Sequence, residues 1–458
     1  MSQEREKLGS RLGFLLISAG CAIGLGNVWR FPFITGEYGG AAFVLIYLLF
    51  LVMLGLPVLT MEFAVGRASQ RGIGQGFKIL QPKGTYWHLH GYLGVLGCIM
   101  LMMFYTTVTG WMLAYCKYSI AGELAGLEPA QIGAFFGGLL QDPYTLVGWM
   151  GLAIAIGAVV CGMGLQAGVE RVTKIMMSCL LLIMIVLVIR AVTLPGAAEG
   201  LKFYLLPDFG RMMEKGFSTV VFAALGQAFF TLSIGIGSMA IFGSYIGKDH
   251  SLTGESINIM CLDTGVALMA GLIIFPACSA FGVDVGAGPG LIFVTLPNVF
   301  NNMPMGNLWG SLFFVFMSFA ALTTVVAVME CIIAYAIDGW GWSRKKAAVT
   351  CGIALFFLSI PCALGFNVWS SFAPLGEGTI VLDLEDFIVS NNLLPLGSMV
   401  FLFFCCSRYG WGWDNFIKEV DTGKGIKFPK CLRFYITYIV PAIVFIVFIQ
   451  GYYEKFFK

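Results

Sequence analysis

Long uncharged apolar segments constrain this chain more than any other feature of its sequence. One of them extends from Leu146 to Met163 without a single charged side chain. About 20 such residues are enough to cross the hydrocarbon core of a bilayer as a helix. Of the 458 residues 58% are hydrophobic and only 11% are charged, too few to cover the surface of a soluble protein of this length. We therefore predict a membrane protein.

The apolar segments predict an all-α polytopic fold, because a helix satisfies the backbone groups of a lipid-embedded segment internally. No linker long enough to separate domains interrupts them. Longer loops are expected at about 121–144, 195–216 and 283–305, the last with a short helix near Leu291–Val299. About eleven transmembrane helices are expected, near 11–36, 40–66, 90–120, 145–163, 171–194, 217–246, 254–281, 307–338, 346–366, 380–408 and 432–453.

The distribution of Lys and Arg predicts the orientation. With the N-terminus in the cytoplasm, most basic loop residues fall on the cytoplasmic side, where loops of membrane proteins are enriched in them. The loop 121–144 then falls outside, with acidic residues and no basic one. Lys202, Arg211 and Lys215 also fall outside, against this rule. We predict a multi-pass protein of the cell membrane with a cytoplasmic N-terminus.

Two short segments in the middle of the first and sixth predicted spans resemble each other. Ala22–Asn27 and Ser233–Ser238 each carry two glycines two positions apart, among small and polar residues. Glycine in a helix interior costs about 1 kcal/mol relative to alanine. Such clusters at matching places of two halves indicate discontinuous helices around a central binding site. Helix packing through small residues also explains the glycines, but it explains the polar neighbours less well.

Several residues in these spans suit the binding of a cation and an anion. Unwound backbone offers carbonyl oxygens, which are ligands for a small cation, and amide groups, which attract a carboxylate. Thr323 and Thr324 place two adjacent hydroxyls in the eighth span, although such hydroxyls also bond back to their own helix. Asp263 lies in the seventh span, where a buried carboxylate requires a cation. Alternatively, it lies at the membrane edge near Lys248 and His250.

The chain also carries three longer motifs, Arg11–Phe14, Gly24–Pro32 and Gly39–Phe43. These three motifs resemble the first two spans of the neurotransmitter:sodium symporter family. Gln227–Ser233 resembles the sixth span of that family, and the similarity continues through Ala320–Thr324. The resemblance covers nearly the whole chain. The compact bacterial amino-acid transporters are the members that it is most similar to.

The resemblance implies an inverted repeat of five plus five spans, with the first and sixth spans broken at a central site. Residues 1–458 then form a single transmembrane domain. Repeat one covers about 11–194, repeat two about 217–408, and an extra helix about 432–453.

The resemblance also implies two sodium ions. By position, the first would be bound by the substrate carboxylate and by Ala22, Asn27, Thr231 and Asp263. The second would be bound by Gly20, Ile23, Ala320, Thr323 and Thr324.

The substrate would be a neutral amino acid bound between the two breaks. Its carboxylate would meet backbone amides and the Tyr105 hydroxyl, and its ammonium group would face backbone carbonyls. The substrate residues implied are Ala22, Gly24, Leu25, Gly26, Leu101, Tyr105, Val108, Phe230, Thr231, Ser233, Ile236, Thr324 and Val328. Tyr105 and Phe230 would close over the substrate. Arg30 would pair with Asp386 on the outer side, and Arg5 with Asp338 on the inner side.

Departures from the family's pattern narrow the expected activity. Chloride-dependent relatives place an asparagine at the position of Asp263 and a hydroxyl at that of Ala267, so we expect no requirement for chloride. Gly24 stands where monoamine carriers have an aspartate, which favours amino acids over amines. Ile236 replaces a larger phenylalanine of the leucine-carrying relative, which favours bulkier apolar or aromatic substrates.

Other classes of function fit the sequence less well. A channel predicts repeated pore-lining elements, and an enzyme needs a nucleophile–base pair or a metal cluster, which the spans do not offer. An amino-acid-binding membrane sensor and a carrier of another small zwitterion stay open as alternatives. The expected partners are the substrate and the lipid bilayer, with no nucleic acid.

Overall fold

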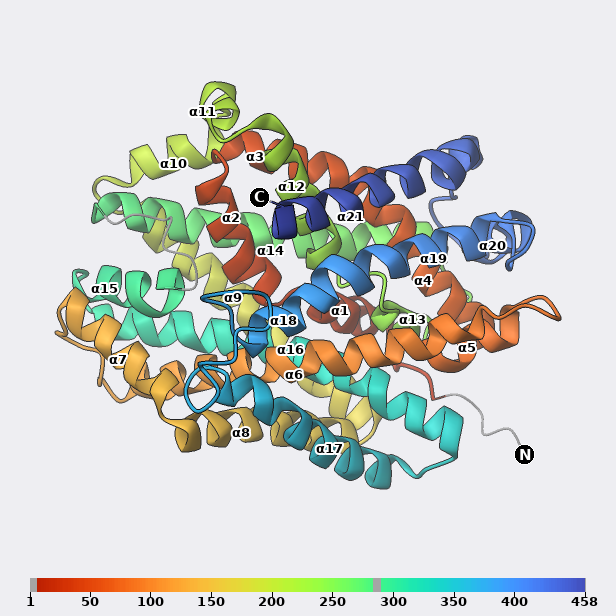
Figure 1. The fold of residues 1–458 in the computed structure, drawn as a ribbon, viewed down its shortest axis with the longest axis horizontal. Helices are drawn as coiled ribbons and strands as arrows, with labels where there is room; N and C mark the ends of the chain where they lie inside the picture. The colour runs from red at the N-terminus through yellow and green to blue at the C-terminus, as the bar shows by residue number, and fades with distance from the viewer. Residues whose placement is uncertain (1–5, 283–289, 458) are drawn as a thin grey trace.

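The fold, a computed structural model, is a bundle of long helices packed side by side (Figure 1). The structure describes residues 6–282 and 290–457. Within them, the only strand-like pairing is one bridge between His250 and Lys424. In the described part of the chain, nine helical stretches are long and apolar enough to span a membrane. They are α3 to α4 (Ala41–Ser69), α6 (His88–Ile120), α8 (Pro143–Gly162), η3 with α9 (Leu165–Val192), α14 (Leu252–Ala280), α16 (Gly306–Trp340), α17 (Arg344–Leu364), α18 to α19 (Val381–Cys406) and η6 to α21 (Lys430–Tyr453).

The first predicted span is broken, as its glycines suggested. The helix α1 (Arg11–Ala22) begins at Ser10, whose hydroxyl accepts from the Gly13 amide, and it ends where Ile23 turns extended. A wider π-helical turn, η1 (Gly26–Arg30), then leads into α2 (Phe31–Glu37). The two halves meet at 54°.

The sixth predicted span is broken as well. The helix α12 (Phe217–Thr231) stops at residue 231, and α13 (Ser238–Gly243) starts only at residue 238. Gly235 and Gly237 between them have φ angles of 102° and 71°, a region that side chains with a β-carbon disfavour. The paired glycines therefore interrupt this helix, and the predicted discontinuity is confirmed.

Short helices cover the two ends of the bundle. At the end that holds the N-terminus lie α5 (Ile73–Leu80) and α20 (Trp413–Val420) (Figure 1). The opposite end carries the expected loops, which form α7 (Pro129–Gln141), α10 (Ala197–Leu205), α11 (Phe209–Glu214) and η4 with α15 (Leu291–Asn301). The short helix expected near residues 291–299 is confirmed. Part of that loop, 283–289, lies outside the described residues.

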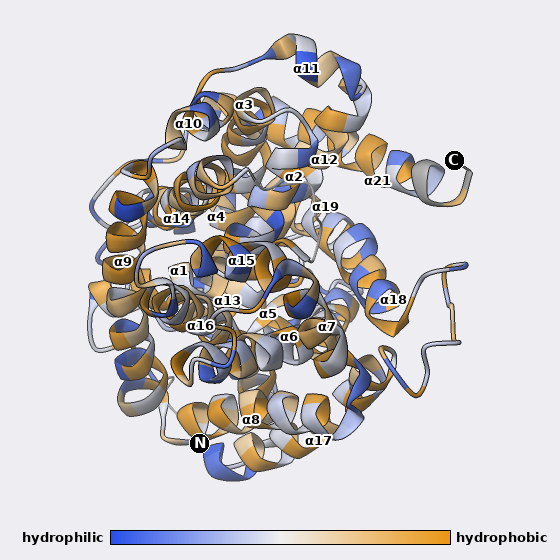
Figure 2. Ribbon diagram, turned by 90° about the vertical axis from the view of Figure 1, so that its left-hand side faces the viewer, coloured by the Kyte–Doolittle hydropathy of each residue, from blue (hydrophilic) through white to orange (hydrophobic). Residues whose placement is uncertain are grey.

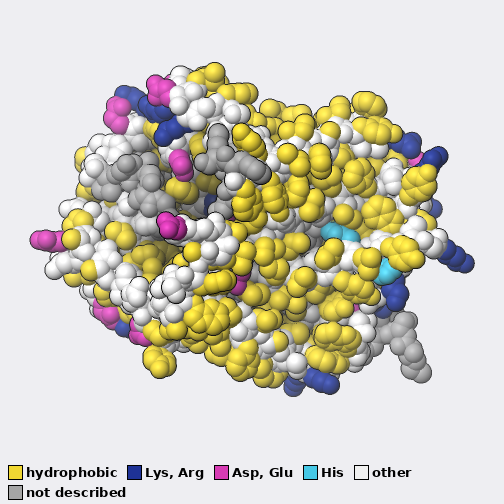
Figure 3. Space-filling model, in the orientation of Figure 1, with side chains coloured by type: hydrophobic (Ala, Val, Ile, Leu, Met, Phe, Trp, Pro, Cys, Tyr) yellow, Lys and Arg dark blue, Asp and Glu magenta, His cyan; other side chains and the backbone are white. Residues whose placement is uncertain are grey.

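The surface has the character of a membrane protein. Hydrophobic residues run through helices such as α3, α9 and α21 (Figure 2). A broad hydrophobic belt crosses the visible face, with most Lys and Arg at the N-terminal end and most Asp and Glu at the other (Figure 3). Of these nine spans α16 is the most buried. In its most apolar stretch 83% of the residues are buried, compared with 22% in Lys430–Tyr453. The helix α16 therefore lies at the centre of the bundle, with α1, α6 and α13 packed against it.

Candidate functional site

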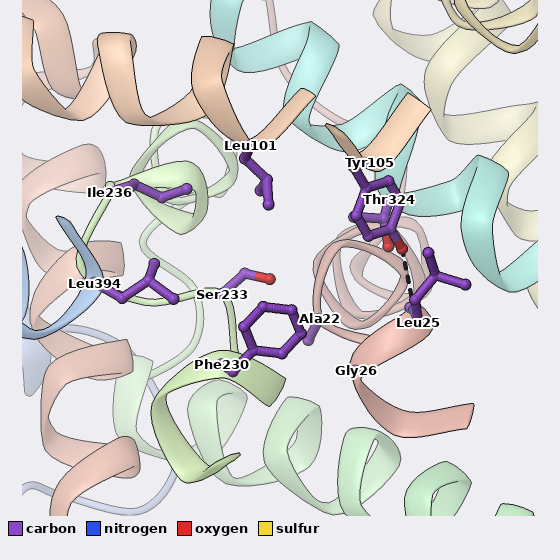
Figure 4. Close-up of a pocket in the computed structure, with 11 residues that line it drawn as sticks. Ala22, Leu25, Gly26, Leu101, Tyr105, Phe230, Ser233, Ile236, Thr324 and Leu394 are labelled. Carbon is purple, nitrogen blue, oxygen red and sulfur yellow. Dashed lines mark hydrogen bonds between the residues drawn. The ribbon is translucent and has the colours of Figure 1, made fainter. Parts of the chain in front are cut away.

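A cavity lies between the two helix breaks (Figure 4). Figure 4 shows Leu25, Tyr105 and Thr324 on one side of the cavity, and Leu101, Ile236 and Leu394 on the other. The cavity is thus polar at one end and apolar at the other. Its lining residues are Ala22, Gly24, Leu25, Gly26, Leu101, Tyr105, Phe230, Ser233, Ile236, Thr324 and Leu394.

The polar end of the cavity consists mainly of backbone. The Leu25 amide donates to the Tyr105 hydroxyl at 3.1 Å. A β-carbon added at Gly24 would contact the Tyr105 hydroxyl and lie 2.6 Å from Thr324 Oγ1. A side chain at Gly24 would therefore have to displace the Tyr105 hydroxyl or Thr324 Oγ1. Peptide amides and one hydroxyl at a helix start suit a carboxylate.

Two polar side chains contact a buried carboxylate next to the cavity. Asn27 Nδ2 donates to Asp263 Oδ1 at 2.8 Å, and Thr231 Oγ1 donates to Asp263 Oδ2 at 3.1 Å. Asn27 Oδ1 in turn accepts from the Gly24 amide at 3.1 Å. All three polar side chains are fully buried. These contacts are with neutral groups, so a bound cation would compensate the charge of an ionised Asp263.

A group of oxygen atoms converges between the end of α1 and α16. Thr324 Oγ1 is 3.2 Å from the Gly20 carbonyl oxygen, 3.3 Å from that of Ile23 and 3.4 Å from that of Ala320. Thr323 Oγ1 donates to the Ala320 carbonyl at 3.0 Å. One hydroxyl carries one proton and cannot satisfy three carbonyl oxygens at once. The surplus of converging hard oxygens fits a small cation.

Three of the expected substrate residues do not line the cavity, and one of them is Thr231, whose hydroxyl donates to Asp263 instead. Val108 lines a second cavity farther along α6, and Val328 is buried one turn beyond Thr324 on α16 without lining either space. Leu394, at the start of α19, lines the cavity although the sequence did not point to it. An apolar leucine in an apolar span carries no signal that distinguishes it from lipid-facing neighbours.

The second cavity adjoins the first one and has Leu25, Tyr105 and Phe230 in common with it. Arg30 and Asp386, the expected outer pair, both line this second cavity. Among the described residues they form no ion pair with each other. The Arg30 guanidinium lies 4.3 Å above the Phe230 ring, and the Ser390 hydroxyl donates to Asp386 at 2.6 Å.

At the N-terminal end of the bundle, the pair predicted between Arg5 and Asp338 stays a prediction, because Arg5 lies outside the described residues. Asp338 Oδ1 lies 3.7 Å from Arg71 Nε. The sequence reasoning missed a larger cluster around Arg344. Arg344 Nη1 donates to Glu330 Oε2 at 2.8 Å, and the Tyr245 hydroxyl donates to Glu330 Oε1 at 2.7 Å. Glu330 is a lone carboxylate within an apolar span, a signal that the sequence does provide.

A second buried carboxylate supports the break in the sixth span. Glu62 on α4 accepts from the Gly235 amide at 2.5 Å and from the Met239 amide at 3.2 Å. Gln227 Nε2 donates to the Gly26 carbonyl at 2.9 Å and so connects the two broken spans. Backbone groups that the breaks leave without helical partners are thereby satisfied.

Comparison with known proteins decides the family. A profile of the sodium:neurotransmitter symporter family matches residues 5–129 and 140–455. The chain belongs to this family. It is a member of a family of sodium-coupled transporters and not of enzymes, and the expected all-α polytopic fold is confirmed.

Individual relatives that match nearly the whole chain support the same family. An uncharacterised sodium-dependent transporter, YhdH, of Bacillus subtilis is 37% identical to this transporter over 98% of both chains. A sodium- and chloride-dependent taurine transporter of the dog is 25% identical over 96% of this chain and 77% of its own. The crystal structure of MhsT in complex with L-phenylalanine superposes with a TM-score of 0.88 at 38% identity, covering 97% of this chain and 99% of that one.

Proposed function

We propose that this transporter imports a neutral hydrophobic or aromatic amino acid together with sodium, by alternating access. The observation that carries the proposal is a cavity at which the backbone of two interrupted helices meets an apolar end, beside the polar cluster around Asp263 and the carbonyl oxygens around Thr324. A zwitterion with an apolar side chain matches this arrangement group by group.

The first ion is proposed to bind between Ala22, Asn27, Thr231 and Asp263, completed by the substrate carboxylate. Sodium then raises the affinity for the substrate, and the substrate raises the affinity for sodium by the same factor, because each provides a ligand or a counter-charge for the other. Asp263 supplies a fixed negative charge beside this ion, so chloride is not required. The hydrogen bonds from Asn27 and Thr231 to Asp263 support the grouping.

The second ion is proposed to bind between Gly20, Ile23, Ala320, Thr323 and Thr324. Gly20 lies in α1, Ile23 follows its last residue, and the other three residues lie in α16. An ion at this position would hold the first half of the broken span against the core of the bundle. Its departure would release that half, which alternating access requires.

The substrate is proposed to lie with its carboxylate at Leu25, Gly26 and Tyr105 and its side chain toward Ile236. The apolar end of the cavity supports a hydrophobic substrate, and so does the neighbour MhsT, whose structure holds L-phenylalanine. Phe230 and Tyr105 separate the cavity from the space that Arg30 and Asp386 line. We propose that these four residues close over the bound substrate.

The orientation is proposed with the N-terminus in the cytoplasm of a cell membrane. The basic side chains at that end of the visible face support it (Figure 3). Moving one charge through 100 mV is worth about 2.3 kcal/mol. Two sodium ions with a zwitterion would therefore gain about 4.6 kcal/mol, enough for roughly thousandfold accumulation.

Uptake into proteoliposomes tests the proposal. Purified protein is assayed with labelled leucine, phenylalanine, tryptophan, alanine and taurine, and sodium and chloride are replaced in turn. We expect sodium-dependent accumulation of the bulky apolar amino acids, unchanged when gluconate replaces chloride. Binding without accumulation would favour a sensor, and preference for taurine would favour another zwitterion. Undiminished substrate affinity in potassium buffer would refute the coupling to sodium.

A further inference from the structure

The apolar end of the cavity includes a residue from the tenth span, which the sequence reasoning did not place at the site. Leu394 is the first residue of α19 (Leu394–Cys406) and is 3% exposed. We propose that Leu394 is a specificity-determining residue, which sets the length of the substrate side chain by forming the end wall of the cavity. This inference rests on the proposed amino-acid transport and specifies the selectivity of the same site.

A close backbone contact brings Leu394 into the cavity. A β-carbon added at Gly235 would collide with the Leu394 carbonyl, and one added at Gly397 would collide with the Gly235 carbonyl. The unwound segment of the sixth span and the first turn of α19 therefore touch backbone to backbone. Helices that pack through glycine approach more closely than helices with larger side chains. Leu394 can reach the cavity because of this approach.

The neighbouring wall residue, Ile236, is held equally firmly. A β-carbon added at Gly97 of α6 would lie 2.7 Å from Ile236 Cγ2. One added at Gly94 would lie 2.8 Å from the Ile236 carbonyl oxygen. Ile236 therefore cannot retreat toward α6. A longer substrate side chain must be accommodated at Leu394, which makes that position decisive.

The position of Leu394 along its helix adds a second consequence. Asp386, which lines the second cavity, lies on α18 (Val381–Ile388). The helix α18, the π-helical turn η5 (Val389–Leu393) and α19 form one continuous span. Eight residues of helix separate Asp386 from Leu394, about 12 Å at the usual rise. A substrate side chain that contacts Leu394 therefore touches the same helix that carries one half of the outer pair.

The test compares three substitutions at Leu394 with a matched one on the same helix. Leu394→Ala lengthens the cavity, Leu394→Phe shortens it, and Leu394→Val provides a milder change that keeps the protein folded if alanine does not. Leu396→Ala is the control, because Leu396 is exposed on α19 and lines neither cavity. Sodium-dependent displacement of labelled leucine by alanine, leucine, phenylalanine and tryptophan gives the affinity ratios.

We expect Leu394→Ala to shift the ratio of tryptophan to leucine affinity about tenfold toward tryptophan, since a missing methylene in an apolar pocket changes affinity by about this factor or more. Leu394→Phe is expected to shift the ratio of phenylalanine to alanine affinity about tenfold toward alanine. Leu396→Ala should leave both ratios unchanged. Equal changes for all substrates, or none, would overturn the inference while leaving amino-acid transport intact. A wild-type protein that binds none of the four in sodium would overturn both.

Discussion

At the scale of single residues, Gly24 sets the chemistry of the polar end of the cavity. Its missing side chain leaves space for the Tyr105 hydroxyl, which accepts from the Leu25 amide, and for Thr324 Oγ1. Both hydroxyls lie beside backbone that the proposed substrate and second ion use. Any β-carbon at this position must displace one hydroxyl or the other.

Gly24→Ala is therefore expected to lower the affinity for sodium and for the amino acid together, by tenfold or more. Its β-carbon would lie 2.6 Å from Thr324 Oγ1, well inside van der Waals contact. Gly226→Ala on α12 is the matched control, because a β-carbon there meets nothing within 4 Å. Equilibrium binding of labelled substrate over a range of sodium concentrations measures both affinities. Wild-type binding by Gly24→Ala would contradict the geometry described for this end.

Single polar residues were the part of the site that the sequence predicted well. Asn27, Thr231 and Asp263 are polar side chains at membrane depth, which is costly unless they meet one another or a ligand, and the structure brings them together. Leu394 could not be predicted in this way. Its place in the cavity depends on the contact between Gly235 and Gly397, which are 162 residues apart in the sequence.

At the scale of helices, α4 and α20 are connected by an ion pair. Arg67 is fully buried near the end of α4, and its Nε donates to Glu419 Oε1 of α20 at 2.6 Å. Arg67 Nη1 also donates to the His250 carbonyl at 2.8 Å. Because the guanidinium is buried away from water, the stability of the fold depends on its keeping these partners.

Glu419→Ala is expected to destabilise the protein by about 3–5 kcal/mol, the usual effect of removing one partner of a buried ion pair. Asp414→Ala is the control. It removes an exposed carboxylate from the first turn of the same helix and is expected to change stability by less than about 1 kcal/mol. Thermal unfolding of the purified protein in detergent measures both effects. Equal unfolding temperatures for the two variants would show that the pair contributes nothing.

The sequence also predicted more of the helices than of their local irregularities. Paired glycines at residues 24 and 26 and at residues 235 and 237 were sufficient to place both breaks, because a regular helix disfavours glycine. The π-helical turns, such as η5 (Val389–Leu393), leave no comparable signal. A π-helical turn changes the side of the helix on which the following side chains lie, and the direction of the Leu394 side chain depends on this change.

At the scale of the whole molecule, the two ends of the bundle differ in how firmly they are closed. At the end away from the N-terminus, Arg30 and Asp386 line one cavity without forming an ion pair among the described residues. At the N-terminal end, Arg344 of α17 holds three parts of the chain together. It contacts Glu330 on α16 at 2.8 Å, Glu6 of the N-terminal segment at 2.9 Å, and the Cys161 carbonyl at 3.3 Å.

Arg344→Ala is therefore expected to favour conformations that are open at the N-terminal end. Charge-assisted hydrogen bonds contribute about 1.5–3 kcal/mol, so their loss would shift the ratio of the two states roughly tenfold or more. Hydrogen–deuterium exchange should increase in residues 6–10 and α1, and the apparent substrate affinity should fall as the competent state becomes rarer. Lys345→Ala, which removes the exposed neighbouring charge, should change neither. Faster exchange spread evenly over all helices would instead indicate general destabilisation, and unchanged exchange would show that Arg344 does not hold this end closed.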